Sequence, residues 1–270
     1  MARVFLYFLF TNYYLASAHV RIFNFTFDDV FDAILDRIFE ENVVNDGPVP
    51  LYWDWRDKNM VSPVKNQGSC NACWAFSAVA NIESHIKIYL GREEVLSEQF
   101  LINCDGGHVG CGSTSVLDTF GRIVTKLGGV LREDDYTRYV ERITPCNWNG
   151  VPKPVPVIGF RRVQSDEEVM AKYVYTHGPL SAGINSASMA KYTGGIDEPT
   201  DKLCSPDKLD HAVLIVGYNV YVDSKTGVVV PYWIIKNSWG TKWGDHGFYY
   251  LVRGRNACGI ANDVSLSIVN

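Results

Sequence analysis

The sequence predicts an α+β protein built as two lobes, with helices in the first half of the chain and strands in the second. The stretch ACWAFSAVANIESHIKIYL, residues 72–90, is apolar on most faces and predicts a buried helix. The later stretches HAVLIVGYNVYV, VVVPYWIIKNSW and GFYYLVRG are rich in β-branched and aromatic residues, which predicts strands. With 270 residues, 47% of them hydrophobic, the chain is long enough for two lobes that share a cleft.

The first 18 residues have the pattern of a secretory signal peptide. Arg3 gives a positive start, an apolar run follows, and the small residues ASA at 16–18 fit the rule for cleavage. The run is too short for a membrane span, and no later stretch is long and apolar enough for one. We therefore expect a protein of the secretory pathway, secreted or lysosomal, with Asn24 of the sequon NFT as a glycosylation acceptor.

Residues 19–48 form a short segment between the signal peptide and the rest of the chain. Within it, TFDDVFDAILDRIFEEN has apolar residues at helical spacing, which predicts one amphipathic helix with Thr26 as its N-cap. The stretch NDGPVP at 45–50 then ends the helix and is typical of a linker.

Two helices are expected in the first lobe. The buried helix begins near Cys73 and ends before Gly91, which is a common residue just past a helix end. Ser97 is expected to cap a second, short helix that ends near Cys104. The glycine-rich residues 104–112 that follow predict a loop.

The second lobe begins after a proline-rich crossover, VPKPVPV at residues 151–157. The stretch SDEEVMAKYVYTHG predicts a helix with a capping box from Ser165 to Glu168 and with Gly178 as its terminator. Gly227 is expected in the turn between the first two strands of this lobe.

Seven cysteines are present, so six can pair in an oxidising compartment and one is left over. Cys70 and Cys73 lie three residues apart. A zinc site needs four ligands, but there is no second such pair and no closely spaced histidine pair. A redox pair would follow a strand in a βαβ unit, but the preceding VSPVKNQG is typical of a loop. In a third interpretation Cys70 is structural and Cys73 is a free thiol.

A free Cys73 at a helix N-terminus is a candidate nucleophile. The unpaired N–H groups and the helix dipole at that end favour the thiolate. A nucleophile of this kind needs a basic partner, a group that orients the partner, and donors for an oxyanion. His211 at the start of one strand, Asn237 at the end of another and Gln67 on the loop before the helix have the side chains for these three tasks.

These stretches together, QGSCNACWAF, LDHAVLIVGY and KNSWGTKWGDHGF, resemble the papain-like cysteine proteases. The resemblance covers residues 49–270, and the C-terminal YYLVRGRNACGIAND resembles the cathepsin F and L branches. A hairpin extension, NVYVDSKTGVVVP, lengthens the interval between His211 and Asn237 without moving the strand ends.

The resemblance implies a papain-like two-lobe fold: a helical N-terminal lobe with Cys73, a β-barrel-like C-terminal lobe with His211 and Asn237, and an active site in the cleft between them. It implies a cysteine endopeptidase domain at 49–270, preceded by a signal peptide at 1–18 and a short prosegment at 19–48. The prosegment departs from the family, whose inhibitory propeptides are long and have a characteristic helix pattern.

The resemblance also implies disulfide bonds and further site residues. The implied pairs are Cys70–Cys111, Cys104–Cys146 and Cys204–Cys258, which leave Cys73 free. Trp239 corresponds to a tryptophan that shields the bond between His211 and Asn237 from water, and Asp210 is placed among the substrate-binding residues.

The implied partners are peptide and protein substrates and cystatin-type inhibitors, for a monomer without cofactor or metal. A net charge of −5 and the lack of Lys/Arg clusters with interleaved aromatics argue against nucleic acid as a partner.

Three residues of the expected site depart from the family pattern. Asn71 stands where the family has glycine, and asparagine tolerates a positive φ better than most residues. Ser113 and Thr114 replace two further glycines, which would narrow the cleft or alter non-prime binding.

By motif position Asp263 lies at the floor of the S2 pocket, where its carboxylate would accept arginine at P2, and Gly183 forms part of the wall. Alternatively, Asp263 faces solvent or pairs with Arg253 or Arg255.

Two other functions compete with peptidase activity. One is a non-catalytic papain-like protein that binds peptides or inhibitors, which Ser113, Thr114 and the short prosegment would favour. The other is thiol–disulfide exchange through a reversible bond between Cys70 and Cys73.

Overall fold

The computed structural model describes residues 49–105 and 109–270. The signal peptide, the prosegment with its helix capped by Thr26, and Asn24 lie outside the described residues. No helix in the described part of the chain is long and apolar enough to cross a membrane.

The helical lobe is built around one long helix. α3 (Cys73–Leu90) ends at Gly91, which has a left-handed backbone, so the expected bounds are confirmed. α4 (Glu98–Cys104) begins at Ser97, whose hydroxyl accepts the Phe100 N–H at 3.1 Å, as expected. α5 (Val116–Arg122) continues into the π-helical turn η1 (Ile123–Leu127).

The core of this lobe lies between these helices. Trp74, Ile82, Phe100 and Phe120 are completely buried and belong to one apolar cluster. β2 (Gly129–Val130) and β3 (Val155–Pro156) form a two-stranded sheet that contributes to the same cluster. The described residues also contain three short 3₁₀ helices along the chain, η2 (Glu133–Asp135), η3 (Met189–Lys191) and η4 (Ala257–Gly259).

The second lobe is an eight-stranded sheet with the order β4-β10-β5-β7-β8-β9-β6, with β1 paired to β7. Neighbouring strands are antiparallel except β6 and β9. The strands are β1 (Trp53–Asp54), β4 (Gly159–Arg162), β5 (Leu180–Ile184), β6 (Ile196–Asp197), β7 (His211–Val222), β8 (Val229–Lys236), β9 (Phe248–Val252) and β10 (Val264–Ile268). Among the described residues the end strands β4 and β6 do not pair, so the sheet of this lobe is open and does not close into a barrel. The expected order of a helical lobe followed by a sheet lobe is confirmed.

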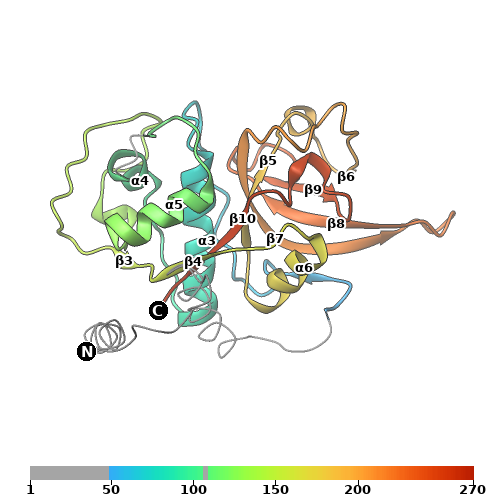
Figure 1. Cartoon of the computed structure of the whole chain (residues 1–270), viewed down its shortest axis with the longest axis horizontal. Helices are drawn as coiled ribbons and strands as arrows, with labels where there is room; N and C mark the ends of the chain where they lie inside the picture. The colour runs from blue at the N-terminus through green and yellow to red at the C-terminus, as the bar shows by residue number, and fades with distance from the viewer. Residues whose placement is uncertain (1–48, 106–108) are drawn as a thin grey trace, which may run out of the picture. The chain divides into compact units, whose positions relative to one another are not determined.

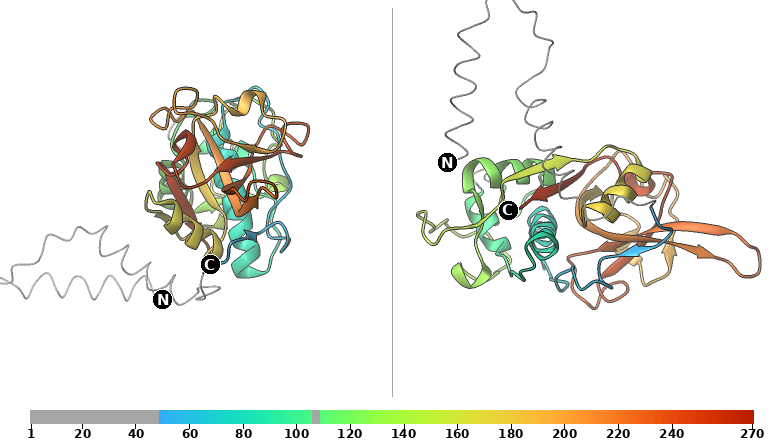
Figure 2. Two further views of the ribbon diagram at one scale, coloured as in Figure 1. Left: turned by 90° about the vertical axis from the view of Figure 1, so that its right-hand side faces the viewer. Right: turned by 90° about the horizontal axis from the view of Figure 1, so that it is seen from below.

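The β7–β8 hairpin projects from this sheet (Figures 1 and 2). The two strands pair from Leu214 with Lys236 at the base to Val222 with Val229 near the tip. Gly227 has a φ of +70° in the turn, as expected of a glycine there.

α6 (Glu167–Thr176) packs against the sheet, but it does not begin as expected. The N-cap is Asp166, whose carboxylate accepts the N–H groups of Glu168 and Val169 at 2.8 and 3.1 Å. Glu168 therefore does not fold back onto Ser165, and its carboxylate lies 3.8 Å from Arg253. Gly178, with a φ of +132°, follows the last turn and ends the helix as predicted.

α3 lies between the helices α4 and α5 and the sheet, and it contacts both (Figure 1). Its buried Ser77 donates a hydrogen bond to the Val213 carbonyl at 2.7 Å and accepts one, at its own carbonyl, from Ser181 at 3.1 Å. Its buried Asn81 donates to the Pro179 carbonyl at 2.8 Å and accepts the Ser267 N–H at 2.9 Å. Polar groups of one helix thus link the two lobes.

Candidate active site

A cavity of about 230 Å³ lies where the lobes meet. The helical lobe contributes Cys73 and residues 113–116, and the sheet lobe contributes Gly183, residues 209–212 and Asp263. The structure thus brings Cys73, Ser113, Thr114, Gly183, Asp210, His211 and Asp263 together around one space.

Cys73 is the first residue of α3, and two contacts hold the helix end in place. The disulfide Cys70–Cys111 ties the preceding loop to the residues before α5, and the Trp74 indole donates to the Gly112 carbonyl at 3.1 Å. The other disulfides are Cys104–Cys146 and Cys204–Cys258, which is the pairing that the resemblance implies. Cys73 is the one free cysteine. Since Cys70 is bonded to Cys111, the redox-pair interpretation is wrong.

Opposing effects act on the Cys73 thiol. Burial raises its pKa, and the nearby Asp210 carboxylate raises it further. The backbone N–H groups of Ala212, Trp74 and Cys73 itself lower the pKa, as expected at a helix N-terminus. The chain therefore provides donors for a thiolate, within a buried site that disfavours an isolated charge.

His211 begins β7 and is held by Asn237, which directly follows β8. His211 Nε2 and Asn237 Oδ1 lie 2.7 Å apart, so the imidazole keeps its Nδ1 for another partner. Burial lowers the pKa of His211, whereas the bond to Asn237 and the Asp210 charge raise it. Asn237 Oδ1 also accepts the Ser238 N–H at 2.8 Å, and Asn237 Nδ2 is buried without a hydrogen-bond partner among the described residues.

Trp239 covers this pair. Its ring centroid lies 4.9 Å from that of His211, with an interplanar angle of 35°. An indole at this distance restricts the access of water to the imidazole, which supports the shielding role expected of it.

Gln67 is buried, and both lobes hold it. Its side-chain N–H donates to the Cys70 carbonyl at 3.0 Å, and its side-chain oxygen accepts the Ser238 hydroxyl at 2.7 Å. The Gln67 backbone N–H donates to the Ser238 carbonyl at 2.8 Å. One amide hydrogen of Gln67 is not used by these bonds. Ser238 was not predicted as a site residue, although it lies inside the KNSWG motif.

Two of the three departures from the family pattern, Asn71 and Ser113, interact with each other. Asn71 Nδ2 donates to the Ser113 hydroxyl at 2.9 Å, so these side chains bridge two loops beside Cys73. Thr114 accepts a long hydrogen bond from Arg122 at 3.4 Å. Asn71 does not have a positive φ, so the tolerance of asparagine for that conformation is not needed here.

Asp263 and Gly183 form one end of the cavity. The Gly183 N–H donates to the Asp263 carbonyl at 2.8 Å, and a Cβ at Gly183 would meet the Asp263 Cβ at 3.4 Å and the Leu209 side chain at 3.0 Å. Burial raises the pKa of Asp263. No ion pair of Asp263 occurs within the described residues: Arg253 lies 3.8 Å from Glu168, and Arg255 lies 3.9 Å from Asp201.

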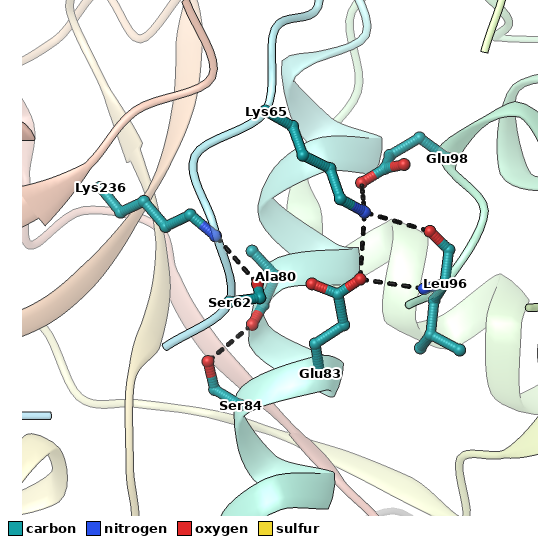
Figure 3. Close-up of polar contacts among 8 residues, drawn as sticks. All are labelled: Ser62, Lys65, Ala80, Glu83, Ser84, Leu96, Glu98 and Lys236. Carbon is teal, nitrogen blue, oxygen red and sulfur yellow. Dashed lines mark hydrogen bonds and ion pairs between the residues drawn. The ribbon is translucent and has the colours of Figure 1, made fainter. Parts of the chain in front are cut away.

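Figure 3 shows a group of charged side chains, most of them buried. The group lies beside Asn237 and Ser238. The Lys65 ammonium donates to Glu83 at 3.0 Å and to Glu98 at 2.7 Å, and the Lys236 ammonium donates to the Ser62 hydroxyl at 3.0 Å. Burial lowers the pKa of Lys236 to about 8. Lys65 is two residues before Gln67 and Lys236 is next to Asn237, so these charges support the chain segments that carry the site.

No group of three or more His, Cys, Asp or Glu within residues 49–105 and 109–270 is arranged to hold a metal ion.

Comparison with known families and proteins agrees with this geometry. The family described as "Papain family cysteine protease" matches residues 49–268. Cathepsin F of Mus musculus is 40% identical over 221 residues, and cathepsin F of Drosophila melanogaster is 38% identical over 224. These alignments cover 82% and 83% of this chain but 46% and 36% of the relatives, so the chain spans about a third to a half of their length. Cysteine proteinase 1 of Dictyostelium discoideum is 36% identical over 96% of this chain and 75% of its own.

Two solved structures share the fold. Digestive procathepsin L2 of the Tenebrio molitor larval midgut has a TM-score of 0.75 at 35% identity, covering 83% of this chain and 70% of that one. The bromelain protease of Ananas comosus, solved with an inhibitor, has a TM-score of 0.71 at 35% identity. The match covers 82% of this chain and 100% of that one. On the family match and these relatives, the chain belongs to the papain family of cysteine proteases.

Proposed function

We propose that this chain is a cysteine endopeptidase that cleaves peptide bonds with the Cys73 thiolate as nucleophile. One observation carries the proposal: the free thiol of Cys73 lines the same cavity as His211, and His211 Nε2 is bound to Asn237. Moving a proton from the thiol to the imidazole leaves the net charge of the site unchanged. The attraction between the two resulting charges then opposes the cost of burying each of them.

The proposed reaction has two stages. Cys73 Sγ attacks the peptide carbonyl carbon, and the oxyanion accepts hydrogen bonds from the free amide hydrogen of Gln67 and from the Cys73 N–H. His211 gives its proton to the amine as the C–N bond breaks, which leaves a thioester on Cys73. Water then attacks the thioester while His211 takes up its proton, and the acid leaves as the thiol re-forms.

The proposal is tested by labelling and activity together. A fluorogenic peptide library measures hydrolysis, and a thiol-directed epoxide followed by peptide mass mapping identifies the reactive cysteine. We expect turnover, its loss after treatment, and one modification at Cys73. Stoichiometric labelling of Cys73 without hydrolysis of any peptide would favour the non-catalytic binding protein instead.

We infer further that Asp263 selects the P2 side chain of the substrate. Its carboxylate borders the cavity, and no described cation lies within ion-pair distance of it, although the charge of Arg162 lowers its pKa. Gly183 has no side chain that would crowd Asp263: a Cβ there would meet the Asp263 Cβ at 3.4 Å. A hydrogen bond to a charged group contributes about 1.5–3 kcal/mol, so arginine at P2 would gain roughly 10- to 150-fold over a side chain without it.

Asp263→Ala is expected to remove this preference. The measurement is kcat/KM for matched peptides with arginine or leucine at P2, with Asp207→Ala as a control that removes an exposed aspartate outside the cavity. Burial raises the pKa of Asp263, so the carboxylate is lost on acidification at a higher pH than an exposed aspartate. The arginine-to-leucine ratio should therefore fall as the medium becomes acidic. A ratio that is the same in wild type and Asp263→Ala would exclude Asp263 from the pocket floor.

We propose that the protein enters the secretory pathway, with residues 1–18 as signal peptide, 19–48 as a short prosegment and 49–270 as the peptidase domain. The N-terminal pattern, the three disulfide bonds and the family match to residues 49–268 support this organisation. Peptides and proteins would be the substrates and cystatin-type inhibitors the partners of a monomer. N-terminal sequencing of protein secreted from expressing cells tests it, with His19 or a later residue expected first.

A further inference from the structure

The loop that carries Gln67 is covered by a segment from far along the chain. The Tyr139 hydroxyl donates to the Gln67 carbonyl at 2.6 Å. The Glu141 carboxylate accepts the Ser69 N–H at 3.1 Å and the Ser69 hydroxyl at 3.3 Å. Two side chains of one segment thus bind the main chain on both sides of Gly68.

The backbone conformations of Gly68 and Glu141 allow the Glu141 carboxylate to approach the loop closely. Gly68 has a φ of +56°, and a Cβ on it would overlap the Glu141 carboxylate, so only glycine allows the contact. Glu141 itself has a φ of +55°, which is unfavourable for a residue with a side chain. Backbone strain of this kind persists where surrounding contacts impose it, and it is frequent at functional sites.

Both helices next to the site fix the segment. The buried Gln99 side chain of α4 accepts the Val140 N–H at 3.0 Å and donates to the Arg142 carbonyl at 2.9 Å. The Tyr139 ring packs edge-on against Phe76 of α3, with 5.0 Å between the centroids. Because Phe76 lies on the first turn of the helix that starts at Cys73, Tyr139 is positioned against the element that carries the nucleophile.

The side-chain amide and the main-chain carbonyl of Gln67 are therefore held by different residues. Ser238 of the sheet lobe orients the side-chain amide, whereas Tyr139 of the helical lobe holds the main-chain carbonyl. The first contact sets the direction of the amide, and the second sets the place of the loop relative to Cys73.

We propose that Tyr139 and Glu141 are positioning residues that hold the Gln67 loop where its amide stabilises the oxyanion. The inference rests on the proposed function. The Tyr139 hydroxyl and the Glu141 carboxylate are both bound to the main chain of the loop, and neither residue borders the cavity, so neither is assigned a contact with substrate.

Tyr139→Phe keeps the ring against Phe76 and removes only the hydroxyl. We expect kcat to fall about tenfold, the size of one ordinary hydrogen bond. KM should stay nearly constant, because the oxyanion exists in the transition state and not in the bound substrate. Tyr136→Phe is the matched control: it removes the hydroxyl of another tyrosine of the segment, which contacts Asn103 and Cys104, and it should leave kcat unchanged.

A double-mutant cycle tests whether the effect passes through Gln67. Gln67→Ala alone should lower kcat on the order of 10²-fold, which is typical of one lost oxyanion donor. In that background Tyr139→Phe should add no further loss, because no amide remains to be positioned. Glu141→Ala should behave like Tyr139→Phe, whereas Glu141→Gln, which keeps an acceptor oxygen, should retain most of the activity.

Several results would overturn the inference. Losses from Gln67→Ala and Tyr139→Phe that multiply, or a Tyr139→Phe effect confined to KM, would show that Tyr139 acts by another route. If Tyr139→Phe does not fold, as judged by its thermal melt, the Glu141→Ala cycle decides in its place. Epoxide labelling of Cys73 separates this failure from that of the proposed function, since an unlabelled and inactive wild type would reject both.

Discussion

Replacing Cys73 with serine is expected to lower kcat on the order of 10⁶-fold, the loss measured for removal of the nucleophile in another hydrolase. The hydroxyl keeps the shape of the side chain, but it does not ionise readily with the donors that this helix N-terminus offers. The measurement is hydrolysis of the best fluorogenic peptide by wild type and variant at equal concentration, with thermal melts to establish that both are folded.

A companion pair of histidine variants controls this result. His211→Ala should lose nearly as much activity as Cys73→Ser, because no imidazole then remains in the cavity to take the thiol proton and to protonate the leaving amine. His246→Ala, which removes a side chain that is 91% exposed, should be as active as wild type. Appreciable turnover by Cys73→Ser, or equal losses in the two histidine variants, would contradict the assignment of nucleophile and base.

The second large effect is on stability, for Lys65→Met. Lys65 is the ion-pair partner of two carboxylates, Glu83 and Glu98, whose side chains are only 2% and 3% exposed. Removing one partner of a buried pair costs about 3–5 kcal/mol in the free energy of unfolding. Since Lys65 is 25% exposed, we expect about 3 kcal/mol, from the lower end of that range.

The destabilisation should depend on pH. Burial raises the pKa of Glu98, so the folded state holds its proton more tightly than the unfolded chain does. The cost of ionising this carboxylate therefore grows as the pH rises from acid to neutral, and without Lys65 only the charge of Lys236, which makes no ion pair with it among the described residues, opposes that cost. The deficit of Lys65→Met should be smallest near pH 4, where Glu98 is protonated, and largest at neutral pH.

Urea unfolding at both pH values measures this deficit, in a Cys73→Ser background that prevents self-cleavage. The control is Lys87→Met, which breaks a pair with the exposed Glu93 and should cost below about 1 kcal/mol. Adding Glu98→Gln to Lys65→Met should restore part of the lost stability. If Lys65→Met costs no more than Lys87→Met at neutral pH, the buried charges do not stabilise the fold as inferred.

Much of the fold could be predicted from the sequence where local pattern and local structure agree. α3 is apolar on most faces and is followed by Gly91, and β7 is a continuous run of strand-forming residues. Ser97 was correctly predicted as the N-cap of α4, the helix that directly follows it. α6 was predicted one residue out of register at its start, because Ser165 and Asp166 are adjacent and both are good cap residues.

The closure of the sheet could not be predicted in the same way. The strands themselves have clear patterns, but whether the two end strands meet depends on strand order and twist, which no local pattern specifies.

The candidate site was predicted unevenly for a related reason. A histidine beside apolar residues can be either a packed core residue or a catalytic one. His211 was predicted as catalytic only because of the motifs that surround Cys73 and Asn237. Tyr139 and Glu141 were not predicted, because their contacts join segments that are 72 residues apart. Asn71 and Ser113 were noted as separate departures, and only the folded chain brings them within 2.9 Å.

The β7–β8 hairpin makes the distance along the chain between His211 and Asn237 irrelevant to the distance between their side chains. The pair at the base, Leu214 with Lys236, stays in register however many residues follow at the tip. Residues 223–228 join the strands at the exposed end, and lengthening such a loop costs little free energy. The tip is therefore a permissive insertion point, where an affinity tag or a fluorophore can be introduced to immobilise or follow the protein without altering its reaction centre.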